Sequence, residues 1–124
     1  MSRKDIESVL KDAKPGIAKF WSSCRESGLR GHGEKFTGKV DRALEAYIAA
    51  LTALPERPTQ SAILDVMKSL FSTLDDVNRE ARGGLLETDE RELLVPVIID
   101  AAAAAGLDVK AFPDGDPTVK FRNF

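Results

Sequence analysis

Apolar residues recur at intervals of three and four along most of the chain, which is the spacing of an amphipathic helix. The clearest stripe follows Thr59, a residue that can cap a helix N-terminus, and it ends before Gly83 and Gly84. This pattern predicts one long helix between residues 59 and 83. The members of its apolar stripe are Ile63, Val66, Met67, Leu70, Leu74 and Val77.

Three further segments show the same helical spacing. The N-terminal segment predicts one or two helices around Pro15, because proline marks a helix start or a break. Four glycines within residues 28–38 then predict a loop. A helix capped by Thr37 and a last one capped by Thr88, which ends at Gly106, complete the pattern. Residues 1–124 are therefore predicted to form a single all-α domain, a bundle of four or five helices.

The spacing of apolar residues changes after Gly106, from the helical pattern to alternation. Alternating apolar residues stand on either side of residues 113–117, whose Pro-Asp-Gly-Asp-Pro sequence is typical of a turn. The alternation predicts a small C-terminal β-ribbon or an ordered extended tail. Docking of this tail on the helices is favoured by three aromatic residues, Phe112, Phe121 and Phe124.

Composition narrows the class of protein. The chain has 124 residues, of which 43% are hydrophobic and 31% charged, as in a globular domain. No stretch approaches the roughly 18 to 20 apolar residues of a membrane-spanning helix. The first residues lack the apolar core of a signal peptide, and Cys24 is the one cysteine. We therefore expect a cytoplasmic protein without a disulfide and without a membrane partner.

The familiar catalytic and ligand-binding patterns are missing. His32 is the one histidine, and it lies in the glycine-rich segment, while Cys24 shares an apolar stripe and is expected to be buried. Gly33 is followed by Glu34 rather than lysine, so the P-loop pattern fails, and Phe36 stands where a dinucleotide fingerprint needs glycine. These departures predict a protein that is no enzyme and binds no cofactor or metal. The small excess of basic residues before residue 43 is too weak to predict nucleic-acid binding.

Acidic residues are concentrated in one part of the chain. Residues 43–108 carry twelve acidic and five basic side chains, and seven of the acids bracket the Gly83-Gly84 turn. This set is compatible with a protein-binding surface, with solvated helix ends and caps, or with a pair of carboxylates in an enzyme or metal site. We name these seven residues the acidic corner: Asp75, Asp76, Glu80, Glu87, Asp89, Glu90 and Glu92.

The acids differ in their relation to the helix dipole. Asp89 and Glu90 fall in the first turn of a predicted helix, where negative charge stabilises the helix. Asp75, Asp76 and Glu80 fall near a helix C-terminus, where negative charge is unfavourable. Residues that do not help their own helix are the stronger candidates for binding a partner.

Part of the sequence resembles a known group of proteins. Residues 83–92 read Gly-Gly-Leu-Leu-Glu-Thr-Asp-Glu-Arg-Glu, and they precede an apolar helix that runs to Leu107. Together with the tail segments 115–118 and 120–124, this region is similar to small bacterial immunity proteins of contact-dependent and secreted (polymorphic) toxin systems. The resemblance implies a small, acidic, cytoplasmic and non-catalytic protein that blocks a cognate toxin by binding it. It also implies that the acidic corner faces a basic toxin domain.

The most concrete hypothesis is therefore a non-catalytic binding module, an immunity protein that neutralises its toxin by stoichiometric binding through an acidic surface. Two alternatives stay open. One is a small enzyme or metal-using protein built on the same carboxylates, and the other is a regulatory adaptor with an unrelated protein partner. The sequence assigns no oligomeric state.

Overall fold

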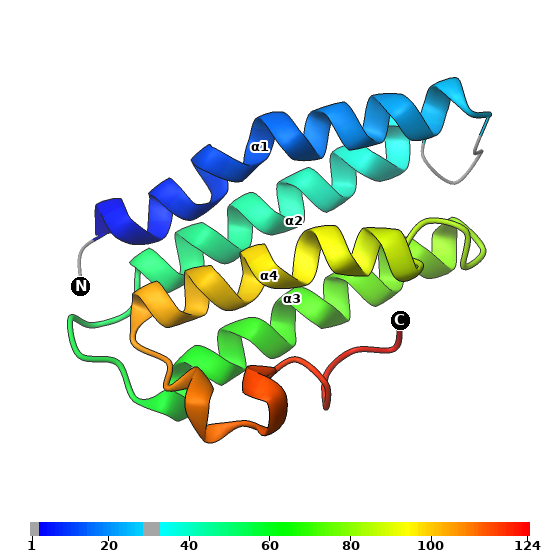
Figure 1. Cartoon of the computed structure of the whole chain (residues 1–124). Helices are drawn as coiled ribbons and strands as arrows, with labels where there is room; N and C mark the ends of the chain where they lie inside the picture. The colour runs from blue at the N-terminus through cyan, green and yellow to red at the C-terminus, as the bar shows by residue number, and fades with distance from the viewer. Residues whose placement is uncertain (1–2, 29–32) are drawn as a thin grey trace.

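The computed structural model describes residues 3–28 and 33–124, and all regular structure within them is helical. The prediction of an all-α fold is confirmed. Neighbouring helices run in opposite directions (Figure 1); α1 packs against both α2 and α4, and α2 packs against α3. The elements are α1 (Arg3–Glu26), α2 (Glu34–Thr52), α3 (Gln60–Glu80), α4 (Thr88–Ala105) and two 3-10 helices, η2 (Val109–Ala111) and η3 (Pro113–Gly115).

The N-terminal segment is one helix rather than two. Pro15 lies inside α1 on its exposed face, and the helix continues through it. The inward residues are spaced by three, four or seven positions, so they fall on one stripe along the whole length of α1. They are Ile6, Leu10, Ile17, Trp21 and Cys24, each 8% exposed or less.

Helix α3 begins as its sequence predicts. The Thr59 hydroxyl accepts a hydrogen bond from the Ala62 amide at 3.0 Å, which satisfies one of the free N–H groups at the helix start. Every member of the predicted stripe is buried except Val66, which is partly buried against the same core. Burial of this stripe, more than helix propensity, stabilises a helix of this length.

Two other predicted caps are wrong. Helix α4 is capped by Glu87 instead of Thr88, and the Glu87 amide donates to Oε1 of Glu90 at 2.9 Å. Helix α2 begins at Glu34, so residues 34–38 of the predicted glycine loop are helical. Thr37 is therefore no cap but a buried residue of the first turn, where its hydroxyl lies 3.3 Å from Nη1 of Arg25 on α1.

The predicted β-ribbon is wrong, because the described chain after residue 108 contains short 3-10 turns and no strand. Asp114 and Gly115 adopt positive φ angles of 57° and 67°, and η2 and η3 precede a return of the chain toward α3. The Phe124 ring lies 6.0 Å from that of Phe71, and Asn123 Nδ2 donates to Asp75 Oδ2 at 2.8 Å. The C-terminal tail (residues 108–124) is thus docked, as its phenylalanines predicted.

A hydrogen-bond network around Asp116 holds the tail. Asp116 Oδ1 accepts from the amide and the hydroxyl of Thr118, a residue with no exposed surface. Asp116 Oδ2 accepts from Nη2 of Arg122 at 3.0 Å, and Arg122 also donates to the Thr118 hydroxyl and to the Phe124 carbonyl. Both charged side chains are largely removed from water, which strengthens the pair.

The buried side chains form one continuous cluster to which all four helices contribute. Near its middle, the Tyr47 hydroxyl donates to the Ile98 carbonyl at 2.9 Å, which ties α2 to α4. Burial raises the pKa of Tyr47 far above its ordinary value, so this phenol stays protonated and remains a donor. Among the described residues, no helix has the length and apolar content needed to cross a membrane.

Candidate functional site

The acidic corner lies at one end of the bundle, where α3 ends and α4 begins (Figure 1). Arg82 and Gly83 both have positive φ angles, 58° and 75°, and the turn that they form joins the two helices. The end of α1 and the start of α2 lie at the same end of the molecule. The structure therefore brings all seven acids to one end of the bundle, but it gives them different surroundings.

The three acids of α3 each contact another side chain of the chain. Asp75 accepts from Asn123 of the docked tail, and Asp76 forms an ion pair with Arg79 one turn along α3. Glu80 pairs with Lys39 of α2, whose Nζ lies 2.5 Å from Oε2, and this contact lowers the pKa of the Glu80 carboxyl. These contacts could not be predicted from the positions of the acids relative to the helix dipole, because two of the three partners come from distant parts of the sequence.

The four acids near the start of α4 divide into two groups. Glu90 is only 4% exposed, and its carboxylate accepts the Glu87 amide, so it supports the helix start and is not available at the surface. Glu87, Asp89 and Glu92 are exposed. We name these three residues the α4 acidic face. Asp89 and Glu92 are three positions apart on a helix and are therefore neighbours on its surface.

Charges from α2 offset the acids on the α3 side. Lys39 and Lys35 both lower the pKa of Glu80, so the positive charge of the α2 start reaches the end of α3. Within the described residues, no ion pair involves Asp89 or Glu92. Negative charge at this end of the bundle is thus most accessible on the α4 side.

Cys24 lies beside the same acids from the α1 side. It is buried, as its place on the α1 stripe predicted. Burial raises the pKa of its thiol, and the negative charges of Glu90 and Asp89 raise it further. Both effects disfavour the thiolate, which is the nucleophilic form of cysteine.

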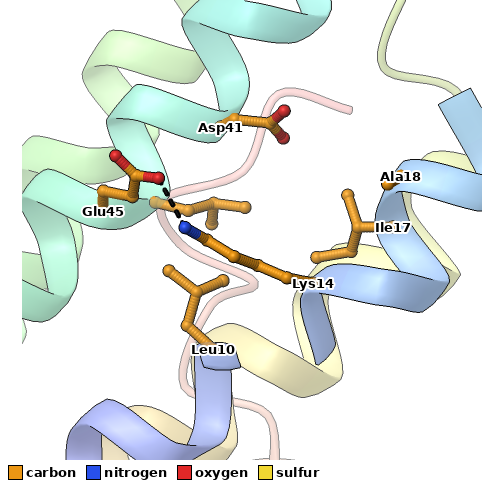
Figure 2. A pocket seen from close by; sticks show the side chains of 7 residues that line it. Leu10, Lys14, Ile17, Ala18, Asp41 and Glu45 are labelled. Carbon is orange, nitrogen blue, oxygen red and sulfur yellow. Dashed lines mark hydrogen bonds and ion pairs between the residues drawn. The ribbon is translucent and has the colours of Figure 1, made fainter. Parts of the chain in front are cut away.

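The sequence did not predict a second feature, a hollow between α1 and α2 of about 160 Å³ (Figure 2). Three charged side chains surround it: Lys14 Nζ lies 2.6 Å from Oε1 of Glu45, and Asp41 Oδ1 accepts from the Trp21 indole at 3.0 Å. The available signal was the i, i+4 spacing of Asp41 and Glu45 beside an apolar stripe. We name this site the α1–α2 hollow; its lining is Leu10, Lys14, Ile17, Ala18, Asp41, Leu44 and Glu45.

Within residues 3–28 and 33–124, no group of three or more histidine, cysteine, aspartate or glutamate side chains is placed to hold a metal ion. His32 and most of the predicted glycine loop lie outside the described residues.

Comparison with known proteins identifies no relative of this chain. No family model, no curated protein and no solved structure matches the chain.

Proposed function

We propose that this protein is a non-catalytic binding module that neutralises a basic protein partner by stoichiometric binding, as an immunity protein neutralises its cognate toxin in the cytoplasm. The observation that carries the proposal is the α4 acidic face, three exposed carboxylates at the start of one helix. Asp89 lies in the first turn, where it offsets the helix dipole, and the Glu87 side chain takes part in the capping box of the same helix. Glu92 lies beyond the first turn, so its charge exceeds what the helix start requires.

The α4 acidic face stands on a well-supported element. Glu90 and the Glu87 amide close the first turn, and Leu85 and Leu86 just before it are buried. The amides of Leu85 and Leu86 both donate to Oδ1 of Asn78 on α3, at 3.3 and 2.9 Å. A binding surface held in this way loses little conformational freedom when a partner binds, and this favours affinity.

The mechanism follows from the sign of the charge. Exposed carboxylates attract a basic partner over about 10 Å at moderate ionic strength, which speeds the encounter. Once bound, the helix end covers part of the basic surface of the partner and keeps other ligands away from it. No chemical step is needed, because occlusion alone neutralises the partner.

A growth-rescue experiment tests this proposal. The candidate partner is a basic protein domain encoded by a gene next to that of this protein. It is produced in a bacterial host with and without the protein, and binding of the two purified proteins is followed by stopped-flow mixing. Replacing Glu87, Asp89 and Glu92 together by Gln, Asn and Gln should abolish the rescue. It should also lower the association rate about tenfold at low salt, with little difference at high salt.

The matched control is the triple change of Asp75, Asp76 and Glu80 to Asn, Asn and Gln. It removes the same charge from α3, where all three side chains already have contacts within the chain. We expect this control variant to keep most of the rescue. Equal loss in both variants would assign binding to the whole acidic corner, and a neighbouring domain that neither slows growth nor binds the protein would refute the proposal.

A further inference from the structure

The α1–α2 hollow has an apolar floor. Leu10, Ile17 and Leu44 form it, and each side chain is 6% exposed or less, so the floor is the outer surface of the core itself. Lys14 and Glu45 meet beside this floor (Figure 2), and both side chains are about half exposed to solvent. An apolar floor below charged groups is suited to a ligand that has an aliphatic part and a charged end.

Asp41 is fixed in position by a buried donor. Trp21 is 2% exposed, and its indole N–H donates to Asp41 Oδ1 at 3.0 Å across the boundary between α1 and α2. A carboxylate has acceptor sites on both oxygens, so this one bond leaves capacity for a further donor. Glu45 stands one turn further along α2, so two carboxylates border the same hollow.

The chain itself places a cation at this site. Lys14 extends over the hollow from α1, and its Nζ reaches Glu45 Oε1 at 2.6 Å (Figure 2). The aliphatic part of this side chain covers the floor while the ammonium group stays at the rim, and the side chain as a whole is about half exposed (52%). An ion pair this exposed contributes little to stability, so a ligand can displace it at little cost.

We propose that the α1–α2 hollow binds an aliphatic cation, an alkyl guanidinium or alkyl ammonium, whose carbon chain lies on the apolar floor and whose charged end pairs with Asp41 and Glu45. A guanidinium suits the site well, because its planar set of donors can pair with two carboxylates at once. Lys14 is the internal competitor for the same place. The proposal is independent of the α4 acidic face, which lies at the start of α4 and not on α1 or α2.

The experiment uses Trp21, the single tryptophan of the chain, as a reporter. Its indole N–H gives one signal in a ¹H–¹⁵N spectrum, and that N–H group donates a hydrogen bond to Asp41 Oδ1. Two cations are titrated: agmatine as a free alkyl guanidinium, and the capped peptide Gly-Arg-Gly as a protein-like one. A capped Gly-norleucine-Gly peptide is the uncharged control. We expect a saturable shift of the indole signal with both cations and none with the control peptide.

Variants of the lining locate the site. Asp41→Asn keeps an oxygen that can accept the indole bond but removes the charge, so affinity should fall about tenfold or more. Asp65→Asn is the matched control, an exposed aspartate on α3, and it should bind like the wild type. Lys14→Met keeps an apolar side chain of similar length without the competing charge, and it should bind up to about fivefold more tightly. Glu45→Gln replaces Asp41→Asn if the latter does not fold.

The titrations distinguish between the possible sources of the cation and can also overturn the proposal. A stronger response to the arginine peptide than to agmatine assigns the hollow to a side chain of a protein partner, and the reverse assigns it to a free amine. The proposal is overturned if neither cation moves the indole signal, if the norleucine peptide moves it equally, or if Asp41→Asn and Asp65→Asn bind alike. None of these results depends on growth rescue, so this inference can fail while the proposed function holds.

Discussion

Asp116 lies at the centre of the network that holds the C-terminal tail, and its replacement by alanine removes three acceptor contacts at once. The lost contacts are two from Thr118 and the ion pair with Arg122, whose side chain is only 16% exposed. One buried hydrogen bond to a charged group contributes about 1.5 to 3 kcal/mol, and solvent lowers the contribution of each bond at a partly exposed site such as this one. Arg122 keeps its bonds to the Thr118 hydroxyl and the Phe124 carbonyl. We therefore expect Asp116→Ala to destabilise the docked tail by about 2 to 3 kcal/mol.

Amide hydrogen exchange measures this effect where it occurs, because a tail can open without unfolding the helices. The amides of Phe121 and Arg122 both donate to the Thr118 carbonyl, so they report on the tail. Their exchange should become about 30- to 150-fold faster, the factor that corresponds to 2 to 3 kcal/mol. Unchanged exchange at these two amides, with an unchanged urea midpoint, would show that the tail does not depend on Asp116.

The same residue gives the tail a pH dependence. Burial raises the pKa of Asp116, but the hydrogen bonds from Thr118 and Arg122 outweigh burial and leave the pKa below its ordinary value of 3.8. A carboxyl group whose pKa is lower in the folded state stabilises that state above about pH 3.8, and the stabilisation is lost as the pH falls further. The tail of the wild type should thus loosen below about pH 3.8, whereas the tail of Asp116→Asn should show no such step.

Two further predictions concern the core. Tyr47→Phe removes the buried hydrogen bond to the Ile98 carbonyl and should lower the free energy of unfolding by about 1 kcal/mol in urea titration, and an unchanged value would mean that this bond adds nothing. Cys24 should react slowly with thiol reagents in the folded protein, because it is buried and its pKa is raised, and rapid labelling without denaturant would contradict this.

The sequence predicted α3 well because one periodic signal and one cap agree there. The Thr59 cap and the buried positions of its apolar stripe are confirmed. The glycine count was less reliable, since Gly38 lies inside α2. An interior glycine costs a helix only about 1 kcal/mol, and burial of neighbours such as Val40 and Leu44 offsets that cost. Packing therefore decided where α2 begins.

In the C-terminal tail, the local sequence pattern is compatible with two different structures. A Pro-Asp-Gly sequence allows positive φ angles, which a tight turn can use with or without flanking strands, and Asp114 and Gly115 adopt such angles here without a strand on either side. The tail is positioned by contacts with α3, such as Phe124 with Phe71, that no local pattern contains.

The charge of the acidic corner also depends on contacts between residues that are distant in the sequence. Seven acids stand close together in the sequence, but Lys39 meets Glu80 across 41 positions, and Glu90 turns inward to the helix start. A count along the chain cannot register either effect. The α1–α2 hollow was missed for a related reason, since Lys14 and Glu45 are 31 positions apart and meet only when α1 and α2 pack.

The packing of α1 against α4 has a consequence for how the molecule folds and unfolds. These two helices are the first and last of the bundle, and α2 and α3 lie between them in the sequence. Closing so long a loop costs entropy before any of the contacts between α1 and α4 form, which slows folding relative to a bundle of sequential neighbours. In return, detaching α1 would expose the buried faces of both α2 and α4. The four helices should therefore unfold together, as one cooperative unit.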